Sequence, residues 1–314
     1  MKAFRDRLQQ FPPIVLDGGL ATTLESHGHD LDDPLWSARL LIENPGAITR
    51  VHREFLTAGA DVITTASYQA SLTGFGVRGL SEAEGERLLR LSVDLAVAAR
   101  DEFWADPANR ADRRCPLVAA SIGPYAAYLA DGSEYHGRYD LNEADLRAFH
   151  EPRWRILADT PADVLACETL PSGREASVLM ALLRETPSRD AWLSFCCRDH
   201  ECLSHGSALS DVVRDLDAAP QVVAVGINCT APQHIAALIA EARRGTSKPV
   251  LVYPNRGEQY DGVNKEWQTG DPAVDWSAAA AEWSDLGAAG IGGCCRIGPR
   301  EIAEVRRALG GERR

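Results

Sequence analysis

The sequence predicts one (β/α)8 barrel, in which eight parallel strands alternate with eight helices. Short apolar runs and segments of helical periodicity follow each other along the whole chain, as expected of a parallel sheet with helical connections. The apolar runs are continuous, which is typical of strands that are buried on both faces. No Pro/Ser-rich linker or change of composition divides the 314 residues, so we expect a single domain spanning residues 1–314.

Eight apolar runs are the expected strands. The first ends in an acidic residue followed by two glycines, Asp17-Gly18-Gly19, and the last ends in two adjacent cysteines. The expected strands cover residues 14–19, 61–68, 116–123, 163–170, 191–198, 222–229, 249–255 and 290–295.

Eight segments between and after these runs are the expected helices. Gly59 is a C-cap residue for the first of them. Ser81 and Glu84 have the spacing of a capping box at the start of the second. The expected helices cover residues 44–59, 81–104, 142–159, 172–185, 208–216, 232–243, 275–286 and 299–309.

The composition limits the compartment and the partners. The formal net charge of −12 disfavours nucleic acid and anionic membranes, because both require a basic face. No apolar run reaches the length of about 18 residues that a membrane span needs, and the first residues lack the apolar core of a signal peptide. We therefore expect a cytoplasmic protein whose eight cysteines are reduced thiols or metal ligands.

Three cysteines stand where two of the expected strands end. Cys229 ends the sixth strand, and Cys294 and Cys295 follow the glycine-rich end of the eighth. These strands are two apart around a barrel, so their ends can share one ion. Three protein ligands with one open position are the arrangement of a catalytic zinc site, and thiolates select zinc. We therefore predict Zn²⁺ bound by Cys229, Cys294 and Cys295.

Other interpretations of these cysteines stay open. Cysteine is among the most buried residue types, and Cys196-Cys197 form a second adjacent pair on the expected fifth strand. Adjacency alone therefore does not indicate a metal site. One rival is a redox protein whose Cys294-Cys295 pair cycles through a disulfide, and another is a zinc-binding barrel without catalytic activity.

Two carboxylates are expected at the same end of the barrel, because Asp17 and Glu168 lie at the ends of the first and fourth strands. They could be a general acid/base pair. They could also bind the ammonium group of an amino acid, with the Gly18 and Gly19 amides receiving its carboxylate. A third interpretation is that Asp17 caps the following loop. Asn255 ends the seventh strand and is a further candidate for substrate binding.

Two long connections leave the same end and contain aromatic residues. They cover residues 124–140 and 256–274, and are candidates for a lid over the site or for packed surface loops. The segment Gly74 to Gly79 matches the dinucleotide-binding fingerprint letter for letter. It does not follow its strand directly, so we expect no nucleotide site there.

Taken together, these residues give the chain a close resemblance to the homocysteine S-methyltransferase family, particularly the bacterial and plant enzymes that use S-methylmethionine. The resemblance includes Gly226-Ile227-Asn228-Cys229 and Ile291-Gly292-Gly293-Cys294-Cys295-Arg296, and it covers essentially the whole chain. The other matching stretches are residues 16–22, 65–71, 121–125, 130–135, 167–171 and 252–255.

The resemblance implies the roles of several residues. It implies that Cys229, Cys294 and Cys295 hold zinc, with the homocysteine thiol in the fourth position. It also implies that Glu168 and the Asp17-Gly18 segment hold the ammonium and carboxylate groups of homocysteine, and that Tyr68 and Trp36 lie near the donor methyl group. Arg78 stands where the family commonly has a small residue, and the sequence offers no reason for it.

The resemblance also implies an activity, a methyl transfer of the EC 2.1.1 class that serves methionine biosynthesis. A methyl group would pass from S-methylmethionine or S-adenosylmethionine to L-homocysteine in a zinc-dependent reaction. Betaine or another donor is the alternative within this class. The sequence leaves open whether the protein is a monomer or a dimer, and whether another thiol or a selenol is the preferred acceptor.

Overall fold

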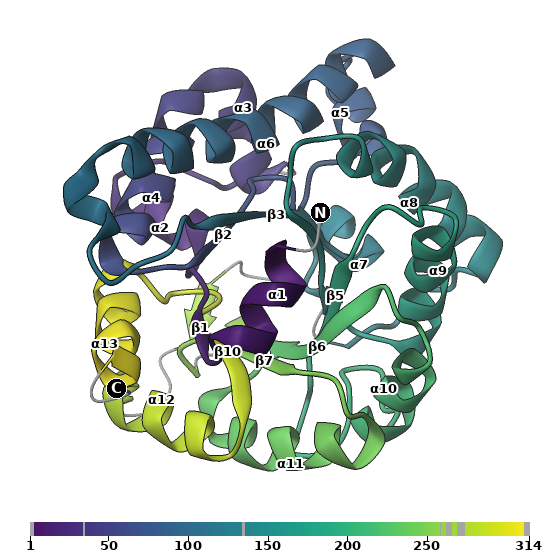
Figure 1. Cartoon of the computed structure of the whole chain (residues 1–314). Coiled ribbons are helices and arrows are strands. Elements are labelled where there is room, and N and C mark those ends of the chain that lie inside the picture. The colour runs from purple at the N-terminus through teal and green to yellow at the C-terminus, as the bar shows by residue number, and fades with distance from the viewer. Residues whose placement is uncertain are drawn as a thin grey trace.

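The computed structural model describes residues 3–33, 35–133, 136–257, 259–261, 266–268 and 274–310. Its central element is an eight-stranded parallel sheet that closes into a barrel surrounded by helices (Figure 1). A parallel bridge between Leu16 and Val62 joins the first strand to the last in this order and completes the barrel. The strands, in their order around the barrel, are β1 (Ile14–Val15), β10 (Ala288–Ile291), β7 (Val250–Tyr253), β6 (Val222–Asn228), β5 (Ala191–Phe195), β4 (Val164–Leu170), β3 (Leu117–Ile122) and β2 (Val62–Thr64). The predicted (β/α)8 barrel is confirmed.

The eight predicted helices are all present, most of them within one or two residues of the expected ends. Ser81 and Glu84 form the predicted capping box, and Gly59 ends the first of these helices in the left-handed conformation, at φ 113°. The helices are α4 (Pro45–Ala58), α6 (Glu82–Ala105), α8 (Glu143–Ala158), α9 (Gly173–Arg184), α10 (Leu209–Asp217), α11 (Ile235–Gly245), α12 (Trp276–Asp285) and α13 (Pro299–Gly310).

Shorter elements lie where loops were expected. Ser71 caps a helix over the glycine-rich segment, because its hydroxyl accepts a hydrogen bond from the Gly74 amide at 3.0 Å. The additional elements are α1 (Ala3–Gln10), α2 (Leu20–Ser26), η1 (Trp36–Arg39), α3 (Leu40–Glu43), α5 (Leu72–Val77), η2 (Pro107–Arg110), α7 (Tyr125–Leu129), η4 (Pro232–His234), and the antiparallel pair β8 (Gln259–Asp261) and β9 (Glu266–Gln268).

Helix α1 lies across the N-terminal end of the barrel (Figure 1). Its buried residues Phe4 and Leu8 join the apolar side chains that fill the barrel interior. The Phe4 ring centroid lies 5.1 Å from that of Trp192 on β5. A second and larger apolar cluster packs between the strands and the surrounding helices. The N-terminal end is therefore closed by side chains, and the C-terminal end is left for the site.

Within the described residues, no helix is both long and apolar enough to cross a membrane.

Candidate active site

A cavity of about 700 Å³ lies at the C-terminal end of the barrel. All but one of the residues predicted to form the site line it: Asp17, Gly18, Trp36, Tyr68, Glu168, Cys229, Cys294 and Cys295. Asn255 is the exception. Strand β7 ends two residues before it, and the Asn255 side chain accepts a hydrogen bond from the Gly257 amide at 3.0 Å. In this structure Asn255 therefore stabilises a turn beside the site.

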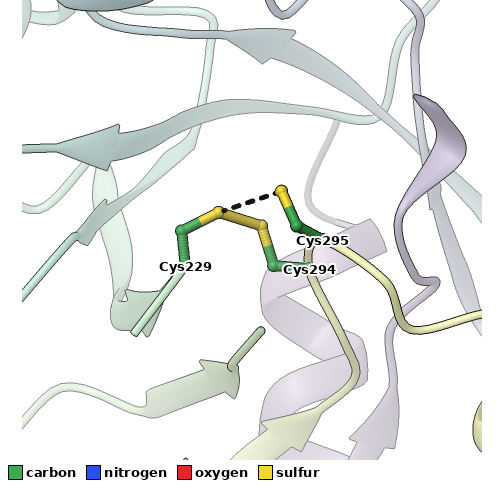
Figure 2. A group of neighbouring side chains, drawn as sticks. All are labelled: Cys229, Cys294 and Cys295. Atoms are coloured by element: carbon green, nitrogen blue, oxygen red, sulfur yellow. Dashed lines mark hydrogen bonds between the residues drawn. A yellow bond between two sulfur atoms is a disulfide. The ribbon is translucent and has the colours of Figure 1, made fainter. Parts of the chain in front are cut away.

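The three cysteines converge from two strands. Cys229 follows β6, and Cys294 and Cys295 follow β10 (Figure 2). Their sulfur atoms all lie within 4.8 Å of one another. The Cys229 and Cys295 sulfur atoms are 3.9 Å apart. Two thiolates on a tetrahedral zinc ion lie about 3.8 Å apart, given a Zn–S bond of about 2.3 Å. The arrangement of these two residues therefore fits a metal site.

Cys229 and Cys294 are joined by a disulfide (Figure 2). The sequence predicts reduced thiols or metal ligands for all eight cysteines, and this pair is neither in this structure. The rival interpretation in which Cys294 pairs with Cys295 is also wrong here, because Cys294 pairs with Cys229. Strands β6 and β10 both flank β7. Their ends therefore bring the Cα atoms of Cys229 and Cys294 to 5.5 Å, a separation that a disulfide can span. A metal held by these residues would require thiolates, so metal binding and the disulfide would exclude each other.

Two glycines allow the segment before the cysteines to pack against the first strand. A Cβ at Gly292 would lie 2.7 Å from the Asp17 carbonyl oxygen, and one at Gly293 would lie 2.2 Å from the Ile297 side chain. The Gly293 amide donates to the Asp17 carbonyl at 2.9 Å. The cysteine segment and the Asp17 segment are thus held together by backbone contacts that a larger residue would prevent.

Asp17 and Glu168 are both buried in the cavity wall. Asp17 accepts hydrogen bonds from the amide and hydroxyl groups of Thr64, at 2.7 and 2.6 Å. Glu168 accepts hydrogen bonds from the hydroxyl groups of Ser121 and Tyr253. Burial raises the pKa of each carboxyl group to about 7, although these donors favour the charged form. Both carboxyl groups are therefore partly ionised near neutral pH.

This geometry bears on two interpretations that the sequence left open, loop capping by Asp17 and carboxylate binding by the Gly19 amide. The Asp17 carboxylate binds Thr64 on the neighbouring strand, so it does not cap its own loop. The Gly19 amide donates to the Ile297 carbonyl at 2.8 Å. That amide therefore already has a hydrogen-bond partner, which disfavours the interpretation in which Gly19 receives a substrate carboxylate.

Sequence reasoning missed Tyr253, which lines the cavity and is buried. Its hydroxyl accepts a hydrogen bond from the Trp192 indole at 3.0 Å and bonds to Ser194 and to Glu168. It links Glu168 to the interior of the barrel. Leu251 and Tyr253 both belong to the interior cluster, as expected for alternate residues of a strand. A polar residue at an inward position of an apolar run was the signal that could have identified it.

Two aromatic rings form another part of the wall. Trp36 and Tyr68 meet edge to face, with their ring centroids 6.2 Å apart. Trp36 has a φ of 47°, in the left-handed region that side chains with a Cβ rarely adopt. Thr169 and Cys229, which also line the cavity, share this conformation. Such backbone strain gathers at functional sites, where the surrounding structure holds it in place.

The long connection between β3 and α8 contributes small residues to the cavity, namely Ala127, Ala130 and Gly132. Instead, its residues Tyr128 and Tyr139 both pack against Tyr125. Tyr125 and Tyr128 also pack against Phe149 of α8. They are therefore part of a packed surface loop in this structure. Of the remaining aromatic residues of the two candidate lids, Tyr135 lies outside the described residues, and Tyr260 and Trp267 are paired in the antiparallel strands β8 and β9.

The cavity lining is acidic. Among the described residues, six carboxylate side chains line it and no lysine or arginine does. The six are Asp17, Glu25, Asp30, Asp32, Asp33 and Glu168. A cationic ligand is favoured in such a cavity, and a polyanionic one is disfavoured.

The fold and the site together define a barrel enzyme in which a three-cysteine group adjoins a pocket with two carboxylates. The model of the homocysteine S-methyltransferase family matches residues 14–309. The chain is 50% identical over 305 residues to homocysteine S-methyltransferase YbgG of Bacillus subtilis (strain 168), covering 97% of each chain. It therefore belongs to the homocysteine S-methyltransferase family and is a methyltransferase.

The chain is also similar to solved structures of the homocysteine methyltransferase MmuM from Escherichia coli. The metallated form aligns with a TM-score of 0.86 and 43% identity, over 97% of this chain and 99% of that one. The oxidized form aligns with the same TM-score and identity, over 97% and 98% of the two chains.

Proposed function

We propose that this protein transfers a methyl group from a sulfonium donor, S-methylmethionine or S-adenosylmethionine, to the thiol of L-homocysteine, and that Cys229, Cys294 and Cys295 hold Zn²⁺ during the reaction. The products are methionine and the demethylated donor. One observation carries the proposal: three cysteine sulfur atoms within 4.8 Å of one another share a cavity with two buried carboxylates and an aromatic pair.

The three cysteines fit a zinc ion by their chemistry and by their separation. Three thiolate ligands leave one position open, which is the arrangement of catalytic zinc sites. When bound, zinc would lower the pKa of the homocysteine thiol and hold it as the nucleophilic thiolate. The disulfide between Cys229 and Cys294 would have to be reduced before the metal binds.

The carboxylates supply the amino-acid pocket. We assign Glu168 and Asp17 to the ammonium group of homocysteine, because they are buried carboxylates in the wall of the same cavity as the cysteines. An ammonium group beside them favours their charged forms. Gly18 lines the same cavity, and close packing requires a glycine there, because a Cβ would lie 2.3 Å from the Ile297 carbonyl oxygen. Holding the substrate in one orientation is a large part of what such a site contributes to the rate.

The donor side of the cavity suits a cation. Trp36 and Tyr68 present aromatic faces and edges there, and aromatic faces attract cations. The six carboxylates add a favourable field for a sulfonium and oppose the negatively charged methylfolates. During transfer, a bond forms between the homocysteine sulfur and the methyl carbon while the methyl–sulfonium bond breaks. The electron pair of the broken bond stays on the donor sulfur, which becomes a neutral thioether. The homocysteine thiol releases its proton.

The disulfide favours a second candidate function, a thiol redox protein in which Cys229 and Cys294 exchange electrons with a partner. This alternative leaves the carboxylates and the aromatic pair without a role. It is tested by the same measurements as the methyl transfer, because it requires no metal.

The test is metal analysis of the reduced protein together with a methyl-transfer assay. We expect about one zinc ion per chain, and loss of both the zinc and the activity in Cys229→Ala. Cys115→Ala is the matched control, because Cys115 is a partly buried cysteine near the start of β3, at the other end of the barrel. It should keep its zinc and its activity. Full activity in zinc-free protein would contradict the proposal.

The donor is tested by initial rates at saturating homocysteine with S-methylmethionine, S-adenosylmethionine and betaine in turn. We expect turnover with at least one of the two sulfonium compounds. Turnover with betaine alone would show that the donor assignment is wrong while leaving the zinc assignment intact. We also infer a cytoplasmic location, because thiols that serve as metal ligands persist in a reducing compartment.

A further inference from the structure

Arg78 is the residue for which the sequence offered no explanation, and it lies outside the cavity lining. It follows helix α5 as its C-cap residue. Its guanidinium group contacts the carboxylate of Asp33, which does line the cavity. The Arg78 side chain is 36% exposed and that of Asp33 only 10%. The contact therefore joins the second βα segment of the barrel to the first, at the edge of the site.

Asp33 controls the turn that leads into Trp36. Its carboxylate accepts a hydrogen bond from the Leu35 amide at 2.8 Å, and its carbonyl accepts one from the Trp36 amide, also at 2.8 Å. The same carboxylate lies 3.8 Å from the guanidinium group of Arg39. The Asp33 carboxylate thus contacts two arginine side chains and accepts a hydrogen bond from one backbone amide. Trp36 is the last residue of the turn that these contacts hold.

Trp36 needs such support because its backbone is in the left-handed region, at φ 47°. Without external contacts, a residue with a large side chain relaxes to negative φ, which would turn the indole away from Tyr68. A second contact holds the same segment, because a Cβ at Gly74 of α5 would lie 3.3 Å from a Leu35 methyl group. Helix α5 and its cap residue therefore support the turn from one side.

We propose that Arg78 is a positioning residue for the methyl donor: through Asp33, it holds Trp36 against Tyr68 so that the aromatic pair can receive the cation. This inference rests on the proposed function, which places the donor at these two rings. Arg78 itself does not touch the substrate, so its removal should weaken donor binding and leave homocysteine binding unchanged.

The direction of the effect separates positioning from simple electrostatics. Arg78 compensates the charge of Asp33, a carboxylate of the cavity lining. If charge alone mattered, removing Arg78 would make the cavity more negative and lower the KM for a cationic donor. If Arg78 holds the turn, the same change frees Trp36 and raises that KM.

The experiment measures KM for S-methylmethionine and for homocysteine in the zinc-loaded enzyme. We expect Arg78→Ala to raise the donor KM about fivefold, in line with the energy of a partly exposed ion pair. KM for homocysteine and kcat should stay within about twofold, and Arg78→Lys should restore most of the donor affinity. Arg90→Ala is the matched control, because Arg90 is 37% exposed and forms ion pairs with Glu86 and Asp159 away from the cavity.

A double-mutant cycle with Trp36→Phe adds a measurement that general loosening of the fold would not reproduce. In the Trp36→Phe background, Arg78→Ala should have little further effect on the donor KM. An equal effect in both backgrounds, a lowered donor KM, or a result identical to Arg90→Ala would overturn the inference while the methyl transfer stands. Absence of turnover with any sulfonium donor in the unmodified enzyme would overturn the proposed function and this inference with it.

Discussion

Glu168 is a buried carboxyl group whose ionisation is opposed by burial, although we propose that the ionised form binds the substrate. The fold removes its carboxyl group from water and surrounds it with the hydroxyl groups of Ser121 and Tyr253. These two donors do not offset the burial fully, and the pKa of Glu168 stays raised to about 7. Its charge is therefore available to a bound ammonium group and is disfavoured in the empty site. The same holds for Asp17, whose pKa is raised by burial and, to a smaller extent, by the charge of Glu168.

The first prediction at this scale concerns pH. We propose that the ionised form of Glu168 binds the ammonium group, and kcat/KM for homocysteine should therefore rise as the pH increases through about 7 and then level off. Glu168→Gln should reduce kcat/KM at pH 8 by roughly tenfold or more, and should reduce the dependence on pH. The substrate thiol titrates equally in both proteins, so the difference between their profiles reports Glu168.

The stability of the same variant provides the control. The pKa of Glu168 is higher in the folded protein than in the unfolded chain, so its ionisation opposes folding above pH 7 and has no effect well below pH 4. Glu168→Gln should therefore be more stable than the unmodified protein at pH 8, by about 1–3 kcal/mol, and show little gain at pH 4. Glu241→Gln changes a buried carboxylate on α11, outside the cavity, and should leave the homocysteine profile unchanged. A Glu168→Gln profile with the original pH dependence would show that another group titrates.

At the scale of elements, the long strands and helices followed from the sequence because each has a clear apolar period. The short helices did not. Helix α5 contains Gly74 and Gly76, which disfavour a helix, and it forms because Ser71 caps it and Phe75 is fully buried. Helix α1 has only 8 residues, too few for a reliable periodic signal. In both cases tertiary contacts, which the sequence does not display, decide the structure.

Most residues of the site could be predicted, because the direction of the parallel strands determines the end of the barrel at which their last residues lie. Asp17, Glu168 and Cys229 stand at strand ends, and parallel strands bring all such ends to one side of the barrel. Asn255 lies two residues beyond the end of β7, as Asp17 lies two residues beyond β1, but its side chain binds the Gly257 amide and does not line the cavity. The pairing of Cys229 with Cys294 could not be predicted, because the sequence does not report the oxidation state of a thiol.

The prediction at this scale tests whether α1 is part of the barrel core. Phe4 is 1% exposed and contacts Trp192 in the interior. Phe4→Ala should lower the free energy of unfolding by about 3–5 kcal/mol, as expected for a buried aromatic side chain. Urea denaturation measures this change. Gln9→Ala, at an exposed position of the same helix, should change the stability by less than about 0.5 kcal/mol.

The activity of Phe4→Ala under conditions where it remains folded should be close to that of the unmodified enzyme, because α1 and the cysteines lie at opposite ends of the barrel. A loss of stability as small as that of Gln9→Ala would contradict the assignment of α1 to the core.

At the scale of the whole molecule, the net charge of the chain and the charge of the cavity lining are both negative. The chain has a formal net charge of −12, and the six carboxylates of the cavity lining continue this field into the site. The apolar cluster between strands and helices draws residues from most of the described chain, and the family model matches residues 14–309. Both observations support our proposal that residues 1–314 form one domain.

The corresponding prediction concerns salt. If the field draws the cationic donor into the cavity, kcat/KM for S-methylmethionine should fall severalfold as NaCl is raised from about 20 to about 300 mM, because the Debye length shortens to below about 10 Å. Homocysteine carries no net charge at neutral pH, so its kcat/KM at saturating donor should change little. A donor kcat/KM that is constant or rises with salt would show that the field does not contribute to capture.

Helix α1 also has a consequence for the order in which the molecule assembles. Its contacts reach far along the chain: Arg7 binds the Cys115 carbonyl, and Arg5 binds Asp190 and the Pro220 carbonyl across 185 and 215 residues. Such distant pairs form slowly, because a large loop must close before they can meet. During synthesis, α1 leaves the ribosome before β3, β5 and β6, so it cannot form these contacts until the later strands have been made. We therefore expect the element that precedes every strand of the barrel to be among the last to reach its native position.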